Sequence, residues 1–228
     1  MILLQKPIII KLGGSLVYKE DGQALKPLGN ILQSCSAKHP LVIVPGGGPF
    51  ADSVRDYGER LNLSEPTCHF MALLAMDQFA YLLQSFIPGS RLTNLADPVS
   101  FPQLSFPSSP QILLCSRYIS LVPPEDLPRS WNVTSDSIAA YLAKQLDASL
   151  LVLLKSVDID PEVKEPDVDA YFHEALSPNL PTWFLNGLYP ERLAELLETG
   201  HTQGVYLGPK TPTSFGKKVP LVHSPVEK

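Results

Sequence analysis

Short apolar runs alternate along the chain with longer stretches in which apolar residues recur at helical spacing. A short apolar run bounded by glycine, proline or polar residues is typical of a buried strand, whereas recurrence every three to four residues indicates an amphipathic helix. The pattern predicts strands at 8–12, 41–44, 111–115, 150–154, 204–207 and 219–222. It predicts helices from about residue 23 onward, at 50–61, at 68–86 and at 135–146.

This alternation determines the expected fold class. Neighbouring parallel strands need a crossover connection, which a helix fills, so the pattern predicts an α/β fold with a mostly parallel sheet and helices on both faces. The length of 228 residues lies near the upper limit of what one hydrophobic core supports. We therefore expect residues 1–228 to form a single domain.

Two segments interrupt the alternation. Residues 97–110 are rich in proline and serine, and residues 158–181 are rich in proline and acidic residues. Such composition predicts long surface loops. Long loops of compact domains either cover a substrate or are plain surface excursions, and the sequence leaves both interpretations open.

Composition and charge narrow the class of partner. Hydrophobic residues make up 44% of the chain and charged residues 18%, which is enough apolar material for a buried core. The formal net charge is −5 and the basic residues form no run, which argues against a nucleic-acid groove and against an anionic membrane surface. The expected partner is a small-molecule substrate.

The sequence shows no clear pattern for secretion, for a membrane-spanning helix or for a metal site built from side chains. The longest apolar run, 148–154, falls far short of the roughly 20 residues of a membrane helix. The N-terminus shows no secretory apolar segment with a cleavage site, so we expect a cytoplasmic protein. The three cysteines have no CxxC spacing and the five histidines no metal-ligand spacing, so no metal site built from side chains is predicted.

Candidate chemistry begins with two glycine clusters, each at the end of a predicted strand. The first is Lys11-Leu12-Gly13-Gly14-Ser15, and the second is Val44-Pro45-Gly46-Gly47-Gly48-Pro49. Glycines let backbone N–H groups approach an anion closely, and Lys11 adds positive charge, although a glycine pair also occurs in plain turns. Because ligands of open α/β sheets bind beyond the carboxyl ends of the strands, two such clusters could hold two phosphate-bearing groups in one crevice.

Two further segments place charged residues near the same edge. Asp136 falls in the first turn of a predicted helix, where the segment 131–137 is also consistent with ordinary capping by Thr134 or Ser135. Lys155 ends the apolar strand of the segment 153–158, and there it either reaches solvent or faces the ligand. GxxxxGK[ST] and GxGxxG motifs are absent from the sequence, which disfavours a P-loop enzyme and a Rossmann oxidoreductase.

Taken in order, KLGGS, VPGGGPF, NVTSDSIAAYLA and LVLLKSVD resemble the amino acid kinase family, which includes acetylglutamate, uridylate and isopentenyl phosphate kinases. The resemblance covers the chain from Ile8 to about Leu207. It implies a three-layer α/β/α sandwich, an ATP-dependent phosphotransferase, and a homo-oligomer.

The resemblance also implies a role for each matching residue. Lys11, Asp136 and Lys155 would be catalytic, with Lys11 stabilising charge on the transferring phosphoryl group and Asp136 orienting the lysines. The residues implied to bind the phosphates of ATP are Gly13, Gly14, Ser15, Lys155 and Asp158. The glycines implied to line the acceptor side are Gly46, Gly47 and Gly48.

Phosphoryl transfer depends mainly on positioning and charge neutralisation. A phosphate or carboxylate acceptor is already ionised at neutral pH, so no catalytic base is required. The expected cofactors are ATP and Mg²⁺, with the metal carried mainly by the phosphates of ATP.

The acceptor is suggested by the segment His69–Gln78 together with the compact length. Both resemble the small kinases of methanofuran biosynthesis, which convert an aminomethylfuran-methyl phosphate to its diphosphate. Arg55 is the candidate ligand of the acceptor's phosphate, and Asp77 of its ammonium group. As packing, the same segment is an amphipathic core helix, and for each single residue this interpretation is favoured.

Two alternatives remain open. One is another phosphate kinase of the family, acting on isopentenyl phosphate or a nucleotide monophosphate, although Pro49-Phe50 lacks the histidine expected for the isopentenyl branch. The other is a non-catalytic member that binds a nucleotide or an oxyanion. Retention of Lys11, Asp136 and Lys155 together argues against this second alternative.

Overall fold

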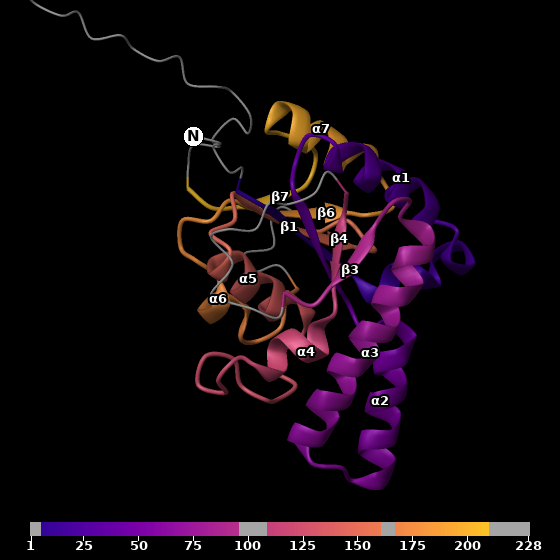
Figure 1. Cartoon of the computed structure of the whole chain (residues 1–228), viewed down its shortest axis with the longest axis vertical. Coiled ribbons are helices and arrows are strands. Elements are labelled where there is room, and N and C mark those ends of the chain that lie inside the picture. Colours follow the sequence, from indigo (N-terminus) through magenta and orange to yellow (C-terminus); the bar gives the residue numbers. More distant parts are fainter. Residues whose placement is uncertain (1–5, 96–108, 161–166, 210–228) are drawn as a thin grey trace, which may run out of the picture.

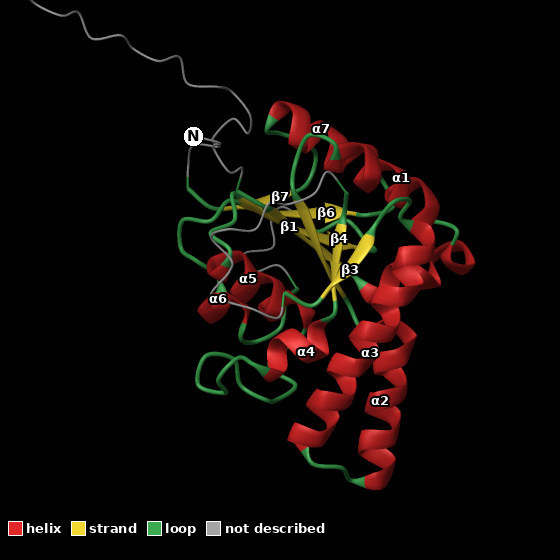
Figure 2. Cartoon of the chain, viewed as in Figure 1, coloured by secondary structure: helices red, strands yellow, loops and turns green. Residues whose placement is uncertain are grey.

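Seven strands form a single sheet in the computed structural model, which describes residues 6–95, 109–160 and 167–209. The strand order is β3-β4-β2-β1-β5-β6-β7, and every neighbouring pair is parallel except β6 with β7. The strands are β1 (Ile8–Leu12), β2 (Leu41–Pro45), β3 (Arg91–Thr93), β4 (Gln111–Leu113), β5 (Leu150–Lys155), β6 (Thr182–Asn186) and β7 (Val205–Leu207). The predicted α/β class with a mostly parallel sheet is confirmed (Figure 2).

Helices cover both faces of this sheet (Figure 1). The helical elements are η1 (Gly14–Gly22), α1 (Leu25–Ser36), α2 (Gly48–Leu61), α3 (Glu65–Phe86), α4 (Cys115–Ser120), α5 (Ser135–Gln145), α6 (Phe172–Ala175) and α7 (Glu191–Thr199). Apolar side chains of α1, α7 and part of α3 pack on one face, and those of α4, α5 and α6 pack on the other. Helices α2 and α3 form a hairpin that extends beyond the sheet (Figure 1).

The alternation of side chains along the central strands decides which face each residue joins. Ile8, Ile10 and Leu12 belong to the core cluster beneath α1 and α7, whereas Ile9 belongs to the cluster beneath α5. Because successive side chains of a strand point to opposite faces, Lys11 follows Ile9 onto the α5 face. Lys155 follows Leu151 and Leu153 onto that face in the same way.

Several elements differ from the sequence-based expectation. Strands β3 and β6 and helices α4, α6 and α7 were not predicted, and Cys115 begins a helix instead of ending a strand. Residues 158–181 are not simply a surface loop, because they contain α6 and the fully buried Phe172. A helix of four residues is too short to give a periodic signal, which explains this error.

Other expectations lie outside the described residues or concern the membrane. The strand expected at 219–222 and most of the loop expected at 97–110 fall on segments that the structure does not describe. Within the described ranges, no helix has the length and apolar content needed to cross a bilayer.

Candidate active site

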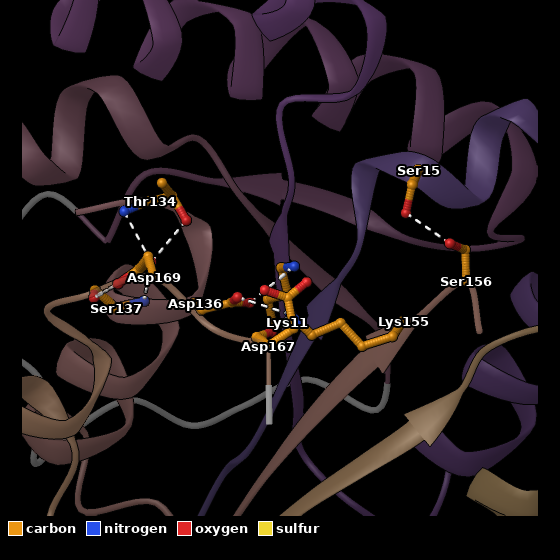
Figure 3. Close-up of polar contacts among 9 residues, drawn as sticks. All are labelled: Lys11, Ser15, Thr134, Asp136, Ser137, Lys155, Ser156, Asp167 and Asp169. Atoms are coloured by element: carbon orange, nitrogen blue, oxygen red, sulfur yellow. Dashed lines mark hydrogen bonds and ion pairs between the residues drawn. The ribbon is translucent and has the colours of Figure 1, made fainter. Parts of the chain in front are cut away.

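A buried cluster of two lysines and one aspartate occupies the carboxyl edge of the sheet (Figure 3). The ammonium nitrogen Nζ of Lys11 lies 2.8 Å from one carboxylate oxygen of Asp136, and Nζ of Lys155 lies 2.9 Å from the other. Only 6% of Lys11 and 5% of Asp136 are exposed. Burying charged groups is costly unless they are paired, so the three side chains hold one another in place.

The fold explains why these three residues meet. Strands β1 and β5 are adjacent and parallel, with Lys11 paired in register with Leu153. Lys155 stands two positions further along β5, at its carboxyl end, and α5 begins just beyond the same edge with Asp136 in its first turn. Three separate segments of the chain therefore place their charged side chains at one point.

Opposing effects set the protonation of the cluster. Burial tends to raise the pKa of Asp136, but the charges and hydrogen bonds of Lys11 and Lys155 outweigh it, so the pKa is lowered. Burial lowers the pKa of Lys155, as does the charge of Lys11, while Asp136 and Asp167 act in the opposite direction. Two lysines facing one carboxylate leave an excess of positive charge, which favours binding of an anion.

A second aspartate, Asp169, fixes the start of α5 (Figure 3). Its carboxylate accepts hydrogen bonds from the backbone N–H of Thr134 at 2.9 Å and of Ser137 at 3.0 Å, and from both hydroxyl groups. Thr134 therefore does not cap the helix through its own side chain as one interpretation expected. Instead, an aspartate more than 30 residues away satisfies the first-turn donors and thereby positions Asp136.

The backbone of Asp167 also contacts this cluster. Nζ of Lys155 donates to the backbone carbonyl oxygen of Asp167 at 2.6 Å (Figure 3). On the other side, the hydroxyl of Ser15 donates to that of Ser156 at 3.0 Å. The loop after β1 is thereby joined to the loop after β5.

The two glycine clusters pack directly against each other. An added Cβ at Gly14 would lie 2.2 Å from the backbone nitrogen of Gly48, and one at Gly46 would lie 2.4 Å from that of Gly14. The backbone amides of Gly13 and Gly46 donate to Leu154 and Leu12 respectively, at 2.9 and 2.8 Å. These two amides are therefore used by the fold, and the glycines are needed because larger residues would separate the loops.

The start of α2 adds anion-binding capacity to this region. This helix of 14 residues begins at Gly48, and no described side chain caps its start or places a carboxylate in its first turn. The first N–H groups of a helix have no partner within the helix and carry a partial positive charge. Together with Lys11, they form a site suited to a phosphate group.

A cavity of about 280 Å³ adjoins this site. It lies at the small end of the range of about 300 to 1,000 Å³ that is typical of ligand pockets, which suits a compact molecule. One part of its wall is polar and the other apolar. The lining includes Lys11, Gly14, Ser15, Tyr18, Gly46, Gly47, Gly48, Asp52, Arg55, His69, Ala72, Leu73, Met76, Trp131, Val133, Thr134 and Ile138.

The structure separates the two residues proposed to recognise the acceptor. Arg55 lines the cavity, pairs with Asp52 at 2.8 Å, and lies 5.1 Å from the centre of the Trp131 ring. Asp77 instead accepts hydrogen bonds from the backbone N–H and the hydroxyl of Ser116, at the start of α4. Among the described residues, Asp77 is not part of the cavity lining.

Asp158 lies apart from the lysine cluster. It forms an ion pair with Arg192 and accepts a hydrogen bond from Asn186 at 3.3 Å. Both partners belong to β6 or α7, on the other side of β5 from the cavity. Asp158 therefore supports the loop that follows Lys155, and direct contact with ATP stays a prediction.

Sequence reasoning missed several residues that the structure brings to the site. Tyr18, Asp52 and His69 line the cavity, and Tyr18 donates to Asp52 at 2.6 Å. This hydrogen bond is the largest of the effects that raise the pKa of Tyr18 to about 12. Tyr18 and Asp52 lie in no glycine cluster and at no strand end, so no local signal distinguished them. His69 begins the segment His69–Gln78 to which the resemblance pointed, but it was not itself assigned a role.

Comparisons with known proteins agree with this geometry. The family model for the amino acid kinase family matches residues 6–165. This chain belongs to the amino acid kinase family. The family also indicates the reaction class. Relatives and solved structures of this fold are kinases that act on phosphate-bearing acceptors, so the protein is a phosphotransferase.

Two curated relatives illustrate the range within the family. The chain is 29% identical over 213 residues to the (5-(aminomethyl)furan-3-yl)methyl phosphate kinase of Methanocaldococcus jannaschii, covering 85% of this chain and 94% of the relative. It is 27% identical over 173 residues to the uridylate kinase of Methanococcoides burtonii, covering 71% and 68% respectively.

Solved structures confirm the family fold. The uridylate kinase of Archaeoglobus fulgidus superposes with a TM-score of 0.64 at 18% identity, covering 89% of this chain and all of that structure. The UMP kinase of Bacillus anthracis gives a TM-score of 0.67 at 15% identity, covering 90% and 97%. The expected three-layer sandwich is therefore confirmed.

Proposed function

We propose that this amino acid kinase transfers the γ-phosphoryl group of ATP to the phosphate of aminomethylfuran-methyl phosphate, giving the diphosphate used in methanofuran biosynthesis. The observation that carries the proposal is the position of Lys11. Lys11 lines the cavity, its backbone belongs to β1, and its ammonium is joined through Asp136 to Lys155. One lysine thus faces the acceptor cavity while the other lies outside the cavity lining.

The residues divide into an acceptor side and a nucleotide side. The start of α2 and Arg55 lie at the cavity and suit the acceptor's phosphate. In this proposal Lys155 would meet the phosphates of ATP from the β5 side, with Lys11 between the two groups. Ser15 lines the cavity and also donates to Ser156, next to Lys155, so it could contact either group. Developing negative charge on the transferring phosphoryl group would then lie beside Lys11, which stabilises it.

Magnesium fits this site as a companion of the nucleotide. Within the described ranges, no group of three or more histidine, cysteine, aspartate or glutamate side chains is placed to hold a metal. Mg²⁺ usually keeps several waters and binds through substrate phosphates, where it neutralises charge. The positive charge supplied by the chain itself comes from Lys11 and Lys155.

The extent of similarity and the size of the cavity support this choice of acceptor. The furan phosphate kinase is matched over 94% of its length, whereas the uridylate kinase named above is matched over 68%. A cavity of about 280 Å³ also suits a single five-membered ring better than a nucleoside. A uridylate acceptor is the second candidate, because relatives with that name match most of this chain.

The test measures ADP release from MgATP with four acceptors: aminomethylfuran-methyl phosphate, UMP, isopentenyl phosphate and acetylglutamate. Turnover with the furan phosphate, exceeding the other three by at least about tenfold in kcat/KM, is expected. Preference for UMP would retain the kinase and replace the acceptor. ATP binding without turnover of any acceptor would favour a non-catalytic member.

A further inference from the structure

His69 is a buried histidine of α3 that lines the cavity but takes no part in the charge cluster. Only 3% of the residue is exposed. Its ring nitrogen Nδ1 lies 3.2 Å from the backbone carbonyl oxygen of Ser130. A carbonyl oxygen can only accept a hydrogen bond, so Nδ1 carries the proton in this contact.

The other ring nitrogen, Nε2, is buried and has no hydrogen-bond partner among the described residues. Burial lowers the pKa of His69, the Ser130 carbonyl raises it, and the charge of Arg129 lowers it, with a net lowering. The ring is therefore neutral at neutral pH, and Nε2 presents a lone pair. A buried acceptor without a partner is unfavourable, so a donor from a ligand would relieve this cost.

The neighbours of His69 indicate which part of a ligand it meets. His69, Ala72, Leu73 and Met76 follow at helical spacing and form one face of α3 along the cavity. This face is apolar except for the histidine. The phosphate-binding groups come from other elements, namely β1 and the start of α2. An acceptor held there by its phosphate would place its organic part against α3.

We propose that Nε2 of His69 accepts a hydrogen bond from the protonated amino group (the ammonium) of the acceptor and thereby selects acceptors that carry such a donor. This inference rests on the proposed function, in which the furan ring bears an aminomethyl group. An acceptor without a donor would leave Nε2 buried and unpaired, and a site built to accept a hydrogen bond rejects such an analogue strongly. His69 thus acts on specificity, and Lys11 on the transfer itself.

The kinetic test compares two acceptors, the aminomethylfuran phosphate and its analogue with a methyl group in place of the aminomethyl group. We expect His69→Phe to lower kcat/KM for the amino acceptor by about 10- to 100-fold, through KM more than kcat, and to leave the methyl analogue nearly unchanged. His69→Gln retains an amide oxygen that can accept, so its loss should be smaller. Met76→Leu, a cavity substitution without a polar atom, should affect both acceptors equally.

Equal losses for both acceptors in His69→Phe and His69→Gln would overturn the inference and assign the histidine a packing role. Thermal unfolding and MgATP binding establish that each variant is folded. If His69→Phe does not fold, the comparison is made with His69→Gln. Failure of the proposed function appears differently, as absence of turnover of the furan phosphate by the unmodified protein.

A second measurement needs no substitution. Nitrogen-15 NMR of the labelled protein should show Nδ1 protonated and Nε2 unprotonated in the free state. Adding the amino acceptor should move the Nε2 resonance upfield, and adding the methyl analogue should not. If both acceptors bind but neither shifts the Nε2 resonance, the proposal is contradicted.

Discussion

At the scale of single residues, the site depends on one carboxylate shared by two lysines. Asp136 is almost fully buried, and its two oxygens are paired with Lys11 and Lys155. Removing one member of such a cluster has two consequences: the site loses charge, and the remaining groups keep their desolvation cost without full compensation. The two effects can be separated, because the first appears in turnover and the second in stability.

Lys11→Ala should lower kcat by at least about 1,000-fold, because the variant lacks the charge that stabilises the transferring phosphoryl group. The fold should persist, since Asp136 keeps its contact with Lys155. ADP release and thermal unfolding measure the two properties, with Lys144→Ala, on the last turn of α5, as the control. Full activity of Lys11→Ala would refute the assigned role.

Asp136→Asn should make the free energy of unfolding less dependent on pH at acidic pH. The folded-state pKa of Asp136 is lowered, so its contribution to stability is fully present above the unfolded pKa of about 3.9 and is lost as pH falls through the folded value. The variant lacks this contribution and also leaves two lysines close together. Urea unfolding between about pH 2 and pH 6 should show a smaller acid loss in the variant than in the native protein, and equal slopes would contradict the prediction.

At the scale of elements, the start of α5 is fixed from outside the helix. Asp169 precedes α6 and accepts hydrogen bonds from two backbone amides and two hydroxyls around the first turn of α5. Helices α5 and α6 are also packed against each other. A contact between two elements therefore determines where Asp136, a residue of the first turn, stands.

Asp169→Ala should destabilise the fold by roughly 2 kcal/mol, because it leaves several donors without their charged acceptor. It should also lower kcat, since Asp136 loses its fixed position. Chemical unfolding and ADP release measure both effects. Glu174→Gln, an exposed change on the neighbouring α6, should stay within about 0.5 kcal/mol of the native protein; a similar loss in both variants would argue against a special role for Asp169.

At the scale of the whole molecule, the α2–α3 hairpin extends away from the sheet (Figure 1). Its helix α3 lines the cavity with one face and exposes apolar side chains on another. Phe70, Leu74 and Tyr81 are each about half exposed, at spacings of four and seven residues that place them on one side of the helix. An exposed apolar stripe of this kind is typical of a contact with another chain.

We expect the chain to form a homo-oligomer through this stripe. Leu74→Lys should shift the protein toward the monomer, because a charged residue would be buried in the contact. Light scattering after size-exclusion chromatography measures the mass, and Lys26→Glu, on the exposed surface of α1, is the control. If the native protein is monomeric at high micromolar concentration, this prediction is wrong.

Consecutive residues were enough to predict the central strands and the residues at their ends. Apolar runs predicted β1, β2 and β5, and the position of Lys11 and Lys155 on these strands placed both at the ligand edge. These features are local, because the burial of a strand and the turn that follows it are encoded in consecutive residues. The short elements β3, α4 and α6 gave too few residues for a periodic signal.

The residues that complete the site from a distance became apparent once the packing of the elements was known. Asp169 reaches α5 across more than 30 residues, and His69 joins Ser130 across 61. The structure also showed that the amides of Gly13 and Gly46 are used within the fold, and that Asp77 serves α4 instead of the cavity. Such contacts depend on how packed elements are oriented relative to one another, and no run of neighbouring residues records that orientation.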